Sequence, residues 1–190
     1  MRLLLLMTLV LVLGATMVLA QDGGRIGLFS DQAGTNCAIT DAAPGLLQVY
    51  VVHIMTGGAT ASQYAAPKPP CFTASYLSDT NVFGVTVGNS QTGVSVGYGT
   101  CRSAPIHLQT ISFFAAGTSS TCCVYSVACD PVSVTGACGA GKLDVVDCGF
   151  TYILGAGQSG VVNSTVDCTC AMIVPERDSS WGQIKALYSE

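Results

Sequence analysis

Residues 81–101 read NVFGVTVGNSQTGVSVGYGTC and carry the clearest structural signal in the chain. Valines and aromatic residues alternate with small or polar residues on both sides of the segment GNSQTG at 88–93. A period of two residues is typical of β-strands, and a Gly- and Asn-rich interruption is typical of a hairpin turn. The segment therefore predicts two antiparallel strands joined by a turn.

The same period of two residues recurs along most of the chain. Residues 46–55 are largely apolar on both faces, which predicts a central strand covered on both sides. Short strands separated by Gly, Pro, Asn and Ser clusters predict an all-β fold over residues 21–174, a two-sheet sandwich of the immunoglobulin-like or jelly-roll type. Further candidate strands are 25–30, 72–77, 106–115, 122–128, 143–154 and 161–174.

Residues 1–20 have the pattern of a secretory signal peptide. Arg2 precedes an apolar run at 3–13, and Val18-Leu19-Ala20 forms a small-residue cleavage site. We expect a protein that is secreted or held at the cell surface, with the periplasm as the alternative. No second apolar run approaches the roughly 20 residues that span a bilayer, so no membrane span is expected in the mature chain.

All ten cysteines follow the signal peptide. An even number in an exported chain predicts five disulfides, and the pairing remains open. Cys71 and Cys101 form one candidate pair because they bracket the predicted hairpin, whereas the neighbours Cys122 and Cys123 should have different partners. The ten are Cys37, Cys71, Cys101, Cys122, Cys123, Cys129, Cys138, Cys148, Cys168 and Cys170.

Charge is sparse in this sequence. Only 9% of the residues are charged, and the net charge is −4. Without a basic stripe to neutralise phosphates, nucleic acid is excluded as an expected partner. The expected partner is an extracellular glycan or protein; no cofactor is expected, and the composition leaves the oligomeric state open.

Residues 175–190 differ from the preceding chain and predict a short linker followed by a C-terminal helix. Ser180 and Gln183 form a capping box, and the next turns place Trp181, Ile184 and Leu187 or Tyr188 on one helical face. Two interpretations stay open. The helix packs its apolar face on the sandwich, or the segment is a sorting or docking tag.

The ending SWGQIKALY at 180–188 resembles a C-terminal sequence of uncharacterised exported, β-rich proteins of uncultured bacteria. The stretch 59–67 and the residues Gly99-Thr100-Cys101 are also similar to those proteins. The resemblance implies bacterial export and implies no activity or catalytic residue.

Two glycine-rich segments imitate nucleotide-binding motifs. Residues 155–160, GAGQSG, match G-x-G-x-x-G, but that fingerprint requires a following helix, and the strand-like 161–166 follows here. We therefore expect a glycine-rich β turn. Residues 136–142 resemble a phosphate-binding loop, but Leu143 stands where Ser or Thr must bind magnesium.

Two chemical alternatives compete with a purely structural protein. Ser159, preceded in the chain by His53 and Asp79, has the residue types of a serine hydrolase, whose mechanism requires the histidine beside the serine hydroxyl. Cys168 and Cys170 could instead bind a metal ion, although an oxidising compartment favours disulfides.

The sequence thus predicts a non-catalytic surface, matrix or binding module rather than an enzyme. Loops on a rigid sandwich often present recognition surfaces, and Tyr64, Tyr76 and Tyr98 could contact a glycan or peptide. Asn163 begins an Asn-Ser-Thr glycosylation sequon, whose use stays open. The candidate loops are 56–62, 88–93, 116–121 and 155–160.

Overall fold

A computed structural model describes residues 23–170 of the chain. This part is built from β-strands, with one short 3-10 helix, η1 (Ala137–Ala140). The strands are β1 (Arg25–Phe29), β2 (Ala38–Ile39), β3 (Pro44–Ile54), β4 (Ala59–Tyr64), β5 (Ser75–Asn81), β6 (Val85–Asn89), β7 (Gly93–Arg102), β8 (Ile106–Ala116), β9 (Cys123–Tyr125), β10 (Lys142–Asp147), β11 (Tyr152–Gln158) and β12 (Gly160–Val162).

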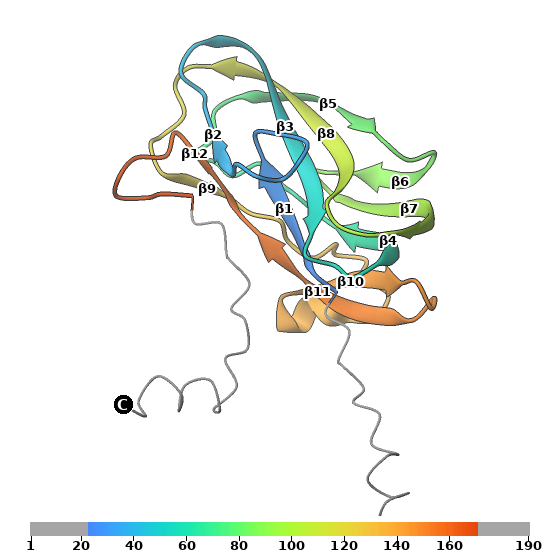
Figure 1. Cartoon of the computed structure of the whole chain (residues 1–190). Coiled ribbons are helices and arrows are strands. Elements are labelled where there is room, and N and C mark those ends of the chain that lie inside the picture. The colour runs from blue at the N-terminus through green and yellow to red at the C-terminus, as the bar shows by residue number, and fades with distance from the viewer. Residues whose placement is uncertain (1–22, 171–190) are drawn as a thin grey trace, which may run out of the picture.

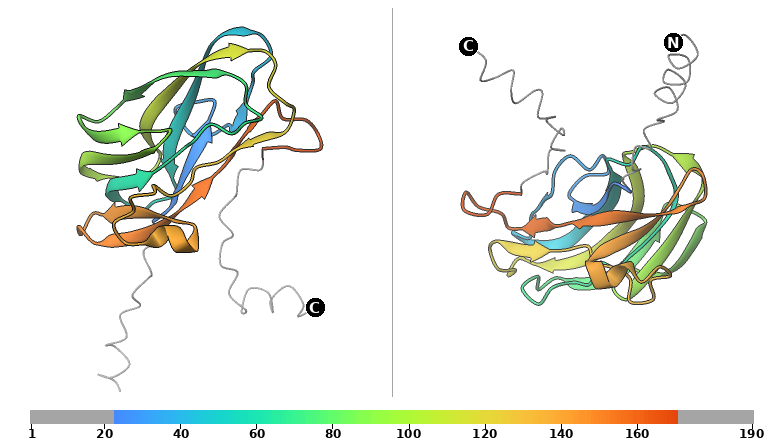
Figure 2. Two further views of the ribbon diagram at one scale, coloured as in Figure 1. Left: turned by 180° about the vertical axis from the view of Figure 1, so that it is seen from behind. Right: turned by 90° about the horizontal axis from the view of Figure 1, so that it is seen from below.

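Nine strands form one large sheet in the order β5-β8-β3-β1-β11-β10-β4-β7-β6, and β2, β12 and β9 form a small second sheet. The large sheet curls until its edge strands β5 and β6 lie on the same side of the molecule (Figures 1 and 2). The Asp79 carboxylate on β5 accepts hydrogen bonds from the backbone and hydroxyl of Ser90, after β6, at 2.7 and 2.8 Å. The predicted all-β fold is confirmed, and its two main layers are halves of one curled sheet instead of two separate sheets.

The core lies between these halves. Phe72, Phe113 and Tyr125 are fully buried there, with ring centroids 4.9 to 6.2 Å apart. The Tyr64 hydroxyl on β4 donates a hydrogen bond of 3.3 Å to the side chain of Gln109 on β8, which connects the halves across the core. Large aromatic side chains supply most apolar burial per residue, so a few of them suffice to fill a core this rich in alanine and glycine.

The hairpin at 81–101 is confirmed. β6 pairs with β7 from Val85 opposite Gly97 to Asn89 opposite Gly93, and residues 90–92 form the turn. The central strand is confirmed as β3, which pairs with β1 and β8. Only its second half is covered on both sides, since Val52 is buried whereas Leu46 is 69% exposed.

All ten cysteines form disulfides, as predicted: Cys37–Cys170, Cys71–Cys123, Cys101–Cys148, Cys122–Cys168 and Cys129–Cys138. Cys122 and Cys123 have different partners, in agreement with the prediction. The candidate pair Cys71–Cys101 is wrong. Because β4 joins β7 to β10 in the sheet, the end of β7 that carries Cys101 lies near the turn after β10, where Cys148 stands.

The glycine-rich residues 155–160 are strand rather than the expected turn, so the candidate loop 155–160 is also wrong. They form the end of β11 and the start of β12, as the chain passes from the large sheet into the small one. A Cβ atom at Gly157 would lie 2.2 Å from the Val127 carbonyl oxygen, and one at Gly160 would lie 2.9 Å from that of Leu28. The glycines are needed because two backbones approach closely here. The sequence pattern alone does not distinguish glycines with this role from glycines in a turn.

The predicted strand 143–154 is two strands, β10 and β11, joined by a turn, and three other predicted strands have shorter or shifted bounds. The stretch 72–77 becomes strand only at Ser75, because the Phe72 amide turns back to the Pro69 carbonyl at 3.1 Å. Within 122–128 only β9 is strand, and within 161–170 only the end of β12 is, since Asn163 has a φ of 49°. The predicted signal peptide and C-terminal helix lie outside the described residues. Between residues 23 and 170, the chain contains no helix with the length and apolar character needed to cross a membrane.

Candidate functional site

The large sheet has an outer side, which faces away from the core. On this side, the strand register places side chains in two rows that cross β6, β7, β4, β10 and β11. The first row is Val85, Gly97, Ala61, Val146 and Tyr152. The second row is Val87, Ser95, Gln63, Asp144 and Leu154. Large apolar side chains therefore end each row, and smaller or polar ones lie in the middle.

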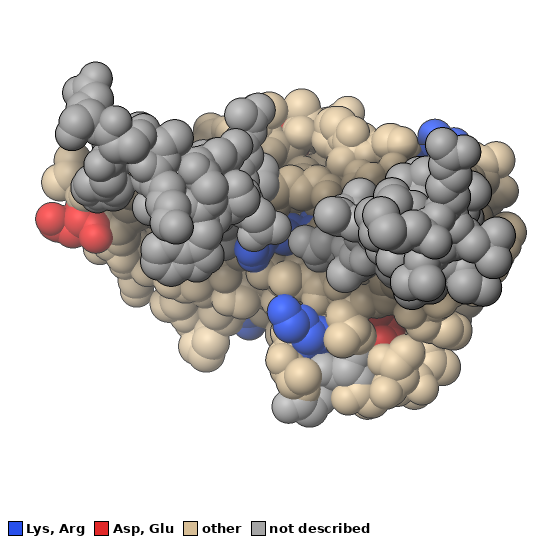
Figure 3. Space-filling model, turned by 60° about the horizontal axis from the view of Figure 1, so that its bottom comes forward, with Lys and Arg blue, Asp and Glu red and all other residues tan. Residues whose placement is uncertain are grey.

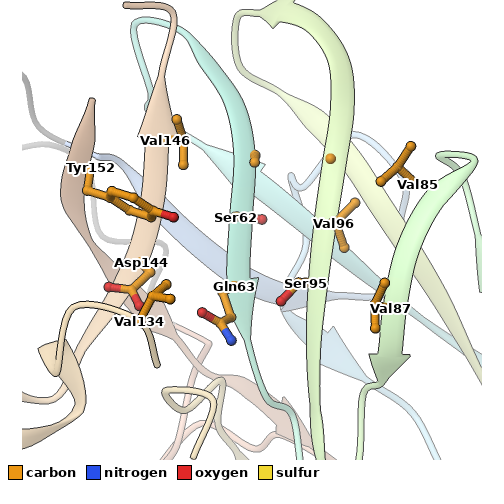
Figure 4. A pocket seen from close by; sticks show the side chains of 12 residues that line it. Ser62, Gln63, Val85, Val87, Ser95, Val96, Val134, Asp144, Val146 and Tyr152 are labelled. Carbon is orange, nitrogen blue, oxygen red and sulfur yellow. The ribbon is translucent and has the colours of Figure 1, made fainter. Parts of the chain in front are cut away.

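This arrangement forms a groove, which we call the outer groove. Its floor is made by the small residues Ala61 and Gly97, one wall by Val85 and Val87 of β6, and its volume is about 290 Å³. The opposite wall consists of Tyr152, Val146 and Val134, and Figure 4 shows the two walls on either side of β4 and β7. The two β6 valines are 67% and 72% exposed, and Tyr152 is 55% exposed. The walls are thus apolar and reachable.

Two polar residues of the second row position the loop that carries Val134. Gln63 donates to the Asp130 carboxylate at 3.1 Å, and Asp144 accepts from the Ser133 hydroxyl at 2.7 Å and from the Thr135 hydroxyl. Burial raises the pKa of Asp144, but the hydrogen bonds from Thr135 and Ser133 outweigh burial and lower this pKa below its ordinary value. Asp144 therefore stays ionised and fastens the loop instead of facing a ligand.

A second depression of about 430 Å³ continues the outer groove along β7 and β10. It shares Ala61 and Val146 with the groove and ends at Phe150, which is 79% exposed. The Cys101–Cys148 disulfide lines this depression and ties the end of β7 to the turn after β10. The groove and its continuation are therefore braced by a covalent bond that crosses β4.

A separate cavity of about 540 Å³ lies where β5, β7 and β8 approach one another. It is lined by Phe83, Arg102 and His107, among others. The Arg102 guanidinium lies 5.1 Å from the centroid of the Phe83 ring, and the His107 Nε2 shares a hydrogen bond of 3.1 Å with the Thr110 hydroxyl. Both basic groups therefore already interact with side chains of this chain.

The structure does not bring Ser159 and His53 together. His53 is buried, donates through Nε2 to the Gly23 carbonyl at 2.7 Å, and shares a hydrogen bond of 3.0 Å between Nδ1 and the Tyr98 hydroxyl. The Ser159 hydroxyl bonds to Ser126 at 2.8 Å. Burial lowers the pKa of His53, and the Gly23 carbonyl opposes this only in part. Asp79, the third residue of the predicted hydrolase site, accepts hydrogen bonds from Ser90. These three residues therefore do not have the arrangement of a catalytic triad.

The metal alternative is also wrong for its named residues. Cys168 and Cys170 are bonded to Cys122 and Cys37, so neither is available as a thiolate ligand. Among residues 23–170, no cluster of three or more His, Cys, Asp or Glu side chains has the arrangement to hold a metal ion.

Asn163, the asparagine of the predicted sequon, holds two segments of the chain together by hydrogen bonds, and we call these contacts the Asn163 clasp. Its Nδ2 donates to the Asp41 and Ser119 carbonyls at 3.1 and 3.0 Å, and its Oδ1 accepts from the Asp41 amide at 2.8 Å. Both amide hydrogens are therefore used inside the fold, and a glycan on Nδ2 would break this clasp. Loop 116–121 belongs to the same clasp, because the Asp41 carboxylate also accepts from the amides of Gly117 and Ser119.

The tyrosines proposed as contact residues are mostly internal. Tyr64 and Tyr98 are buried, and Tyr76 is half-buried with its ring 6.0 Å from that of Phe113. The exposed aromatic residues beside the groove, Tyr152 and Phe150, were not singled out from the sequence. The sequence did contain a signal for this surface. In a hairpin where residue 89 pairs with 93, Val85 lies opposite 97 and Val87 lies opposite 95, all on one face. The buried Val94, Val96 and Tyr98 lie on the other face of the hairpin.

Comparisons with known proteins found fold-level similarities only. No family model matches the chain, and no curated protein matches it. Among the solved structures that resemble it are three whose matches each cover 74% of this chain. A chain of the CaDoc0917–CaCohA2 complex has a TM-score of 0.44 and 11% identity, with 99% of that chain covered.

The other two have TM-scores of 0.43, with 98% of each matched chain covered. One is from the sixth cohesin of scaffoldin B of Acetivibrio cellulolyticus in complex with a Cel5 dockerin variant, at 12% identity. The other is the cohesin module of a family 33 glycoside hydrolase of Clostridium perfringens, at 6% identity. We draw no conclusion about function from similarities at this level.

Proposed function

We propose that this chain is an exported, non-catalytic binding module, and that the outer groove receives an apolar segment of a protein partner. The observation that carries the proposal is the pair of exposed valines, Val85 and Val87, facing Tyr152 across a floor of small residues. A pocket with apolar walls and few polar groups is the usual form of a protein-binding or ligand-binding site. Exposed apolar surface on an exported chain otherwise favours aggregation.

The lining of the groove favours a protein segment over a glycan. A sugar presents many hydroxyl groups, and these need hydrogen-bonding side chains that the receiving protein does not already use. Gln63 and Asp144, two of the polar residues of the groove, are engaged in holding the loop with Val134. The exposed part of the groove is therefore mainly apolar, although the small side chain of Ser95 is also exposed. The exposed apolar residues are Val85, Val87, Val134 and Tyr152.

The scaffold is rigid enough to present such a site without reorganisation. Five disulfides brace the described residues, and Cys101–Cys148 lies beside the groove itself. A preformed site avoids the entropy cost of ordering a loop when the partner binds. The ten disulfide-bonded cysteines also agree with the oxidising compartment that the predicted signal peptide implies.

The test is selection of peptides from a random display library on the mature chain, followed by anisotropy titration of those selected. We expect peptides with two or more large apolar residues, and affinity about tenfold or more weaker for Val87→Asp. The matched control is Leu46→Asp, because Leu46 is similarly exposed, at 69%, on β3 outside the groove. Selected peptides that bind equally well to Val87→Asp would contradict the proposal.

A further inference from the structure

We infer that the C-terminal segment 178–188 of the same chain is the resident occupant of the outer groove. The inference rests on the proposed function for the site and adds the identity of a ligand. The segment carries the three apolar residues Trp181, Ile184 and Leu187 at helical spacing. Its docking would cover the apolar walls until an external partner displaces it.

The point where the described chain ends lies within reach of the groove. Cys170, bonded to Cys37, packs against Phe29, Val52 and Ile54 on the outer side of β1 and β3. β11, which carries the Tyr152 wall, is the next strand after β1 in the sheet. Since neighbouring strands are about 4.8 Å apart, the path from β3 to β11 is about 10 Å. The seven linker residues 171–177 extend up to about 23 Å, so they cover this path with slack.

The outer surface along this path is basic, and the linker is partly acidic. Arg25 of β1 pairs with Ala156 of β11, which pairs with Lys142 of β10, so both cations lie on the outer side between Cys170 and the groove. Glu176 and Asp178, with Arg177 between them, leave one net negative charge in the part of the chain that would cross these cations. Exposed ion pairs contribute little affinity, but they orient an approaching segment. Charged side chains are few on the part of the described surface that is visible in Figure 3.

The dimensions of the segment fit the groove as a helix. From β6 to β11 the groove crosses five strands, which spans about 19 Å. A helix of residues 178–188 is about 16 Å long and would lie across the strands with its apolar face down, whereas the same residues in extended form would measure about 36 Å. Apolar anchors at spacings of three to four residues are the usual way in which a helix occupies a groove.

Attachment through a short linker makes weak affinity sufficient. A flexible linker of this length gives an effective concentration of roughly 1 mM at the groove. A segment with a dissociation constant of about 0.1 mM would then be docked in about 90% of the molecules. For the same reason, the groove of the chain's own domain is favoured over that of a neighbouring copy at ordinary protein concentrations.

Trp181 makes the inference directly testable, since it is the only tryptophan of the chain. In the mature full-length protein we expect blue-shifted Trp181 emission and low acrylamide quenching, both independent of protein concentration. Val87→Asp should shift the emission to that of a solvent-exposed indole and raise the quenching constant severalfold. Leu46→Asp should leave both unchanged. A mature chain that stops after Pro175 should bind the selected peptides about tenfold more tightly than the full-length chain.

Other results would overturn the inference or separate it from the proposed function. Solvent-exposed Trp181 in the unmodified protein, or shielding that Val87→Asp does not change, would overturn it; the proposed function would survive if peptides still bind the groove. Shielding that is lost on dilution would assign the occupant to a second copy and would also overturn it. Shielding that Val87→Asp abolishes, with no peptide bound even after truncation, would support the inference and contradict the proposed function.

Discussion

The outer side of the large sheet has one region that the chain covers and one that it leaves open. Over β1 and β3, residues 30–37 form a cover loop that lies directly on the sheet: a Cβ atom at Gly34 would be 2.9 Å from the Ile54 side chain and 3.1 Å from that of Val52. Over β6 and β7 no loop lies on the sheet among the described residues, and Val85 and Val87 stay exposed. The loop that carries Val134 is held over β4 and β10 only.

The two regions differ in how much apolar surface needs cover. Phe29, Val52 and Ile54 form a buried cluster beneath the cover loop, which the Cys37–Cys170 disulfide and the Asp31 carboxylate hold in place. In the open region, alanine, glycine and serine occupy much of the floor, so less apolar surface is left to water. The fold can therefore leave this region uncovered at low cost, and a groove remains available for binding.

The largest effect is expected from removing the covalent attachment of the cover loop. Cys37→Ala with Cys170→Ala should lower the free energy of unfolding by about 5 kcal/mol, because this disulfide closes a loop of 133 residues. Cys129→Ala with Cys138→Ala, whose disulfide spans 9 residues, should cost about 2.5 kcal/mol. Urea denaturation of both double variants measures the difference. Equal losses would show that chain entropy does not dominate here.

A charge beneath the cover loop should have the next largest effect. Val52→Asp places a carboxylate in a fully buried apolar cluster and should cost about 3–5 kcal/mol of stability, since the charge finds no partner there. Unfolding by urea at neutral pH gives this value. A loss below about 1 kcal/mol would mean that the cover loop opens easily, and the distinction between the two regions would then fail.

Loss of the Asp31 carboxylate should have a moderate effect that depends on pH. Asp31 accepts hydrogen bonds from the Thr35 amide at 3.1 Å and the Asn36 amide at 2.6 Å. Its slight burial raises its pKa, but the hydrogen bonds from Thr35 and Asn36 outweigh this and lower the pKa. Asp31→Ala should cost about 1–2 kcal/mol at neutral pH.

The sign of the pH dependence follows from that lowered pKa. The contribution of Asp31 is complete above the unfolded value of about 3.9 and is lost as the pH falls through the lower folded value. The unmodified protein and Asp31→Ala should therefore converge in stability in strong acid. A difference that stays constant down to pH 2 would assign the effect to packing instead of the carboxylate.

The smallest effect on stability is expected in the open region. Val87→Asp replaces a side chain that is 72% exposed and should change the free energy of unfolding by no more than about 0.5 kcal/mol. The same substitution should weaken peptide binding about tenfold or more, so in the open region binding is expected to change while stability does not. A loss of several kcal/mol would show that this wall supports the fold and would weaken the case for a binding surface.

Local patterns predicted the elements better than the contacts between them. The hairpin of β6 and β7 followed from alternation and turn composition, because both are properties of neighbouring residues. The Cys71–Cys101 pair failed since disulfide partners depend on strand order, which brings Cys101 to Cys148 across β4. The segment 155–160 failed because glycine is required both in turns and where two backbones meet closely.

The candidate site illustrates the same limit. Ser159 and His53 have the residue types of a hydrolase, and only the fold shows that they bond to Ser126 and to Gly23 and Tyr98. Val85 and Val87 were recognised as strand residues, but alternation alone does not say which side of the strand faces the core. The groove also needs Tyr152 and Val146, which the register of β10 and β11 brings into the same row.

The sequence by itself determined that this is a strand-built chain with ten cysteines in disulfides, because alternation and cysteine number are set along the chain. Only the tertiary structure decided which cysteines pair, how one sheet curls into two layers, and which side of β6 meets water. These depend on contacts between residues far apart in the sequence, and their energies are set by the neighbours that folding supplies. The outer groove exists for that reason, as five strands from distant parts of the chain meet there in one register.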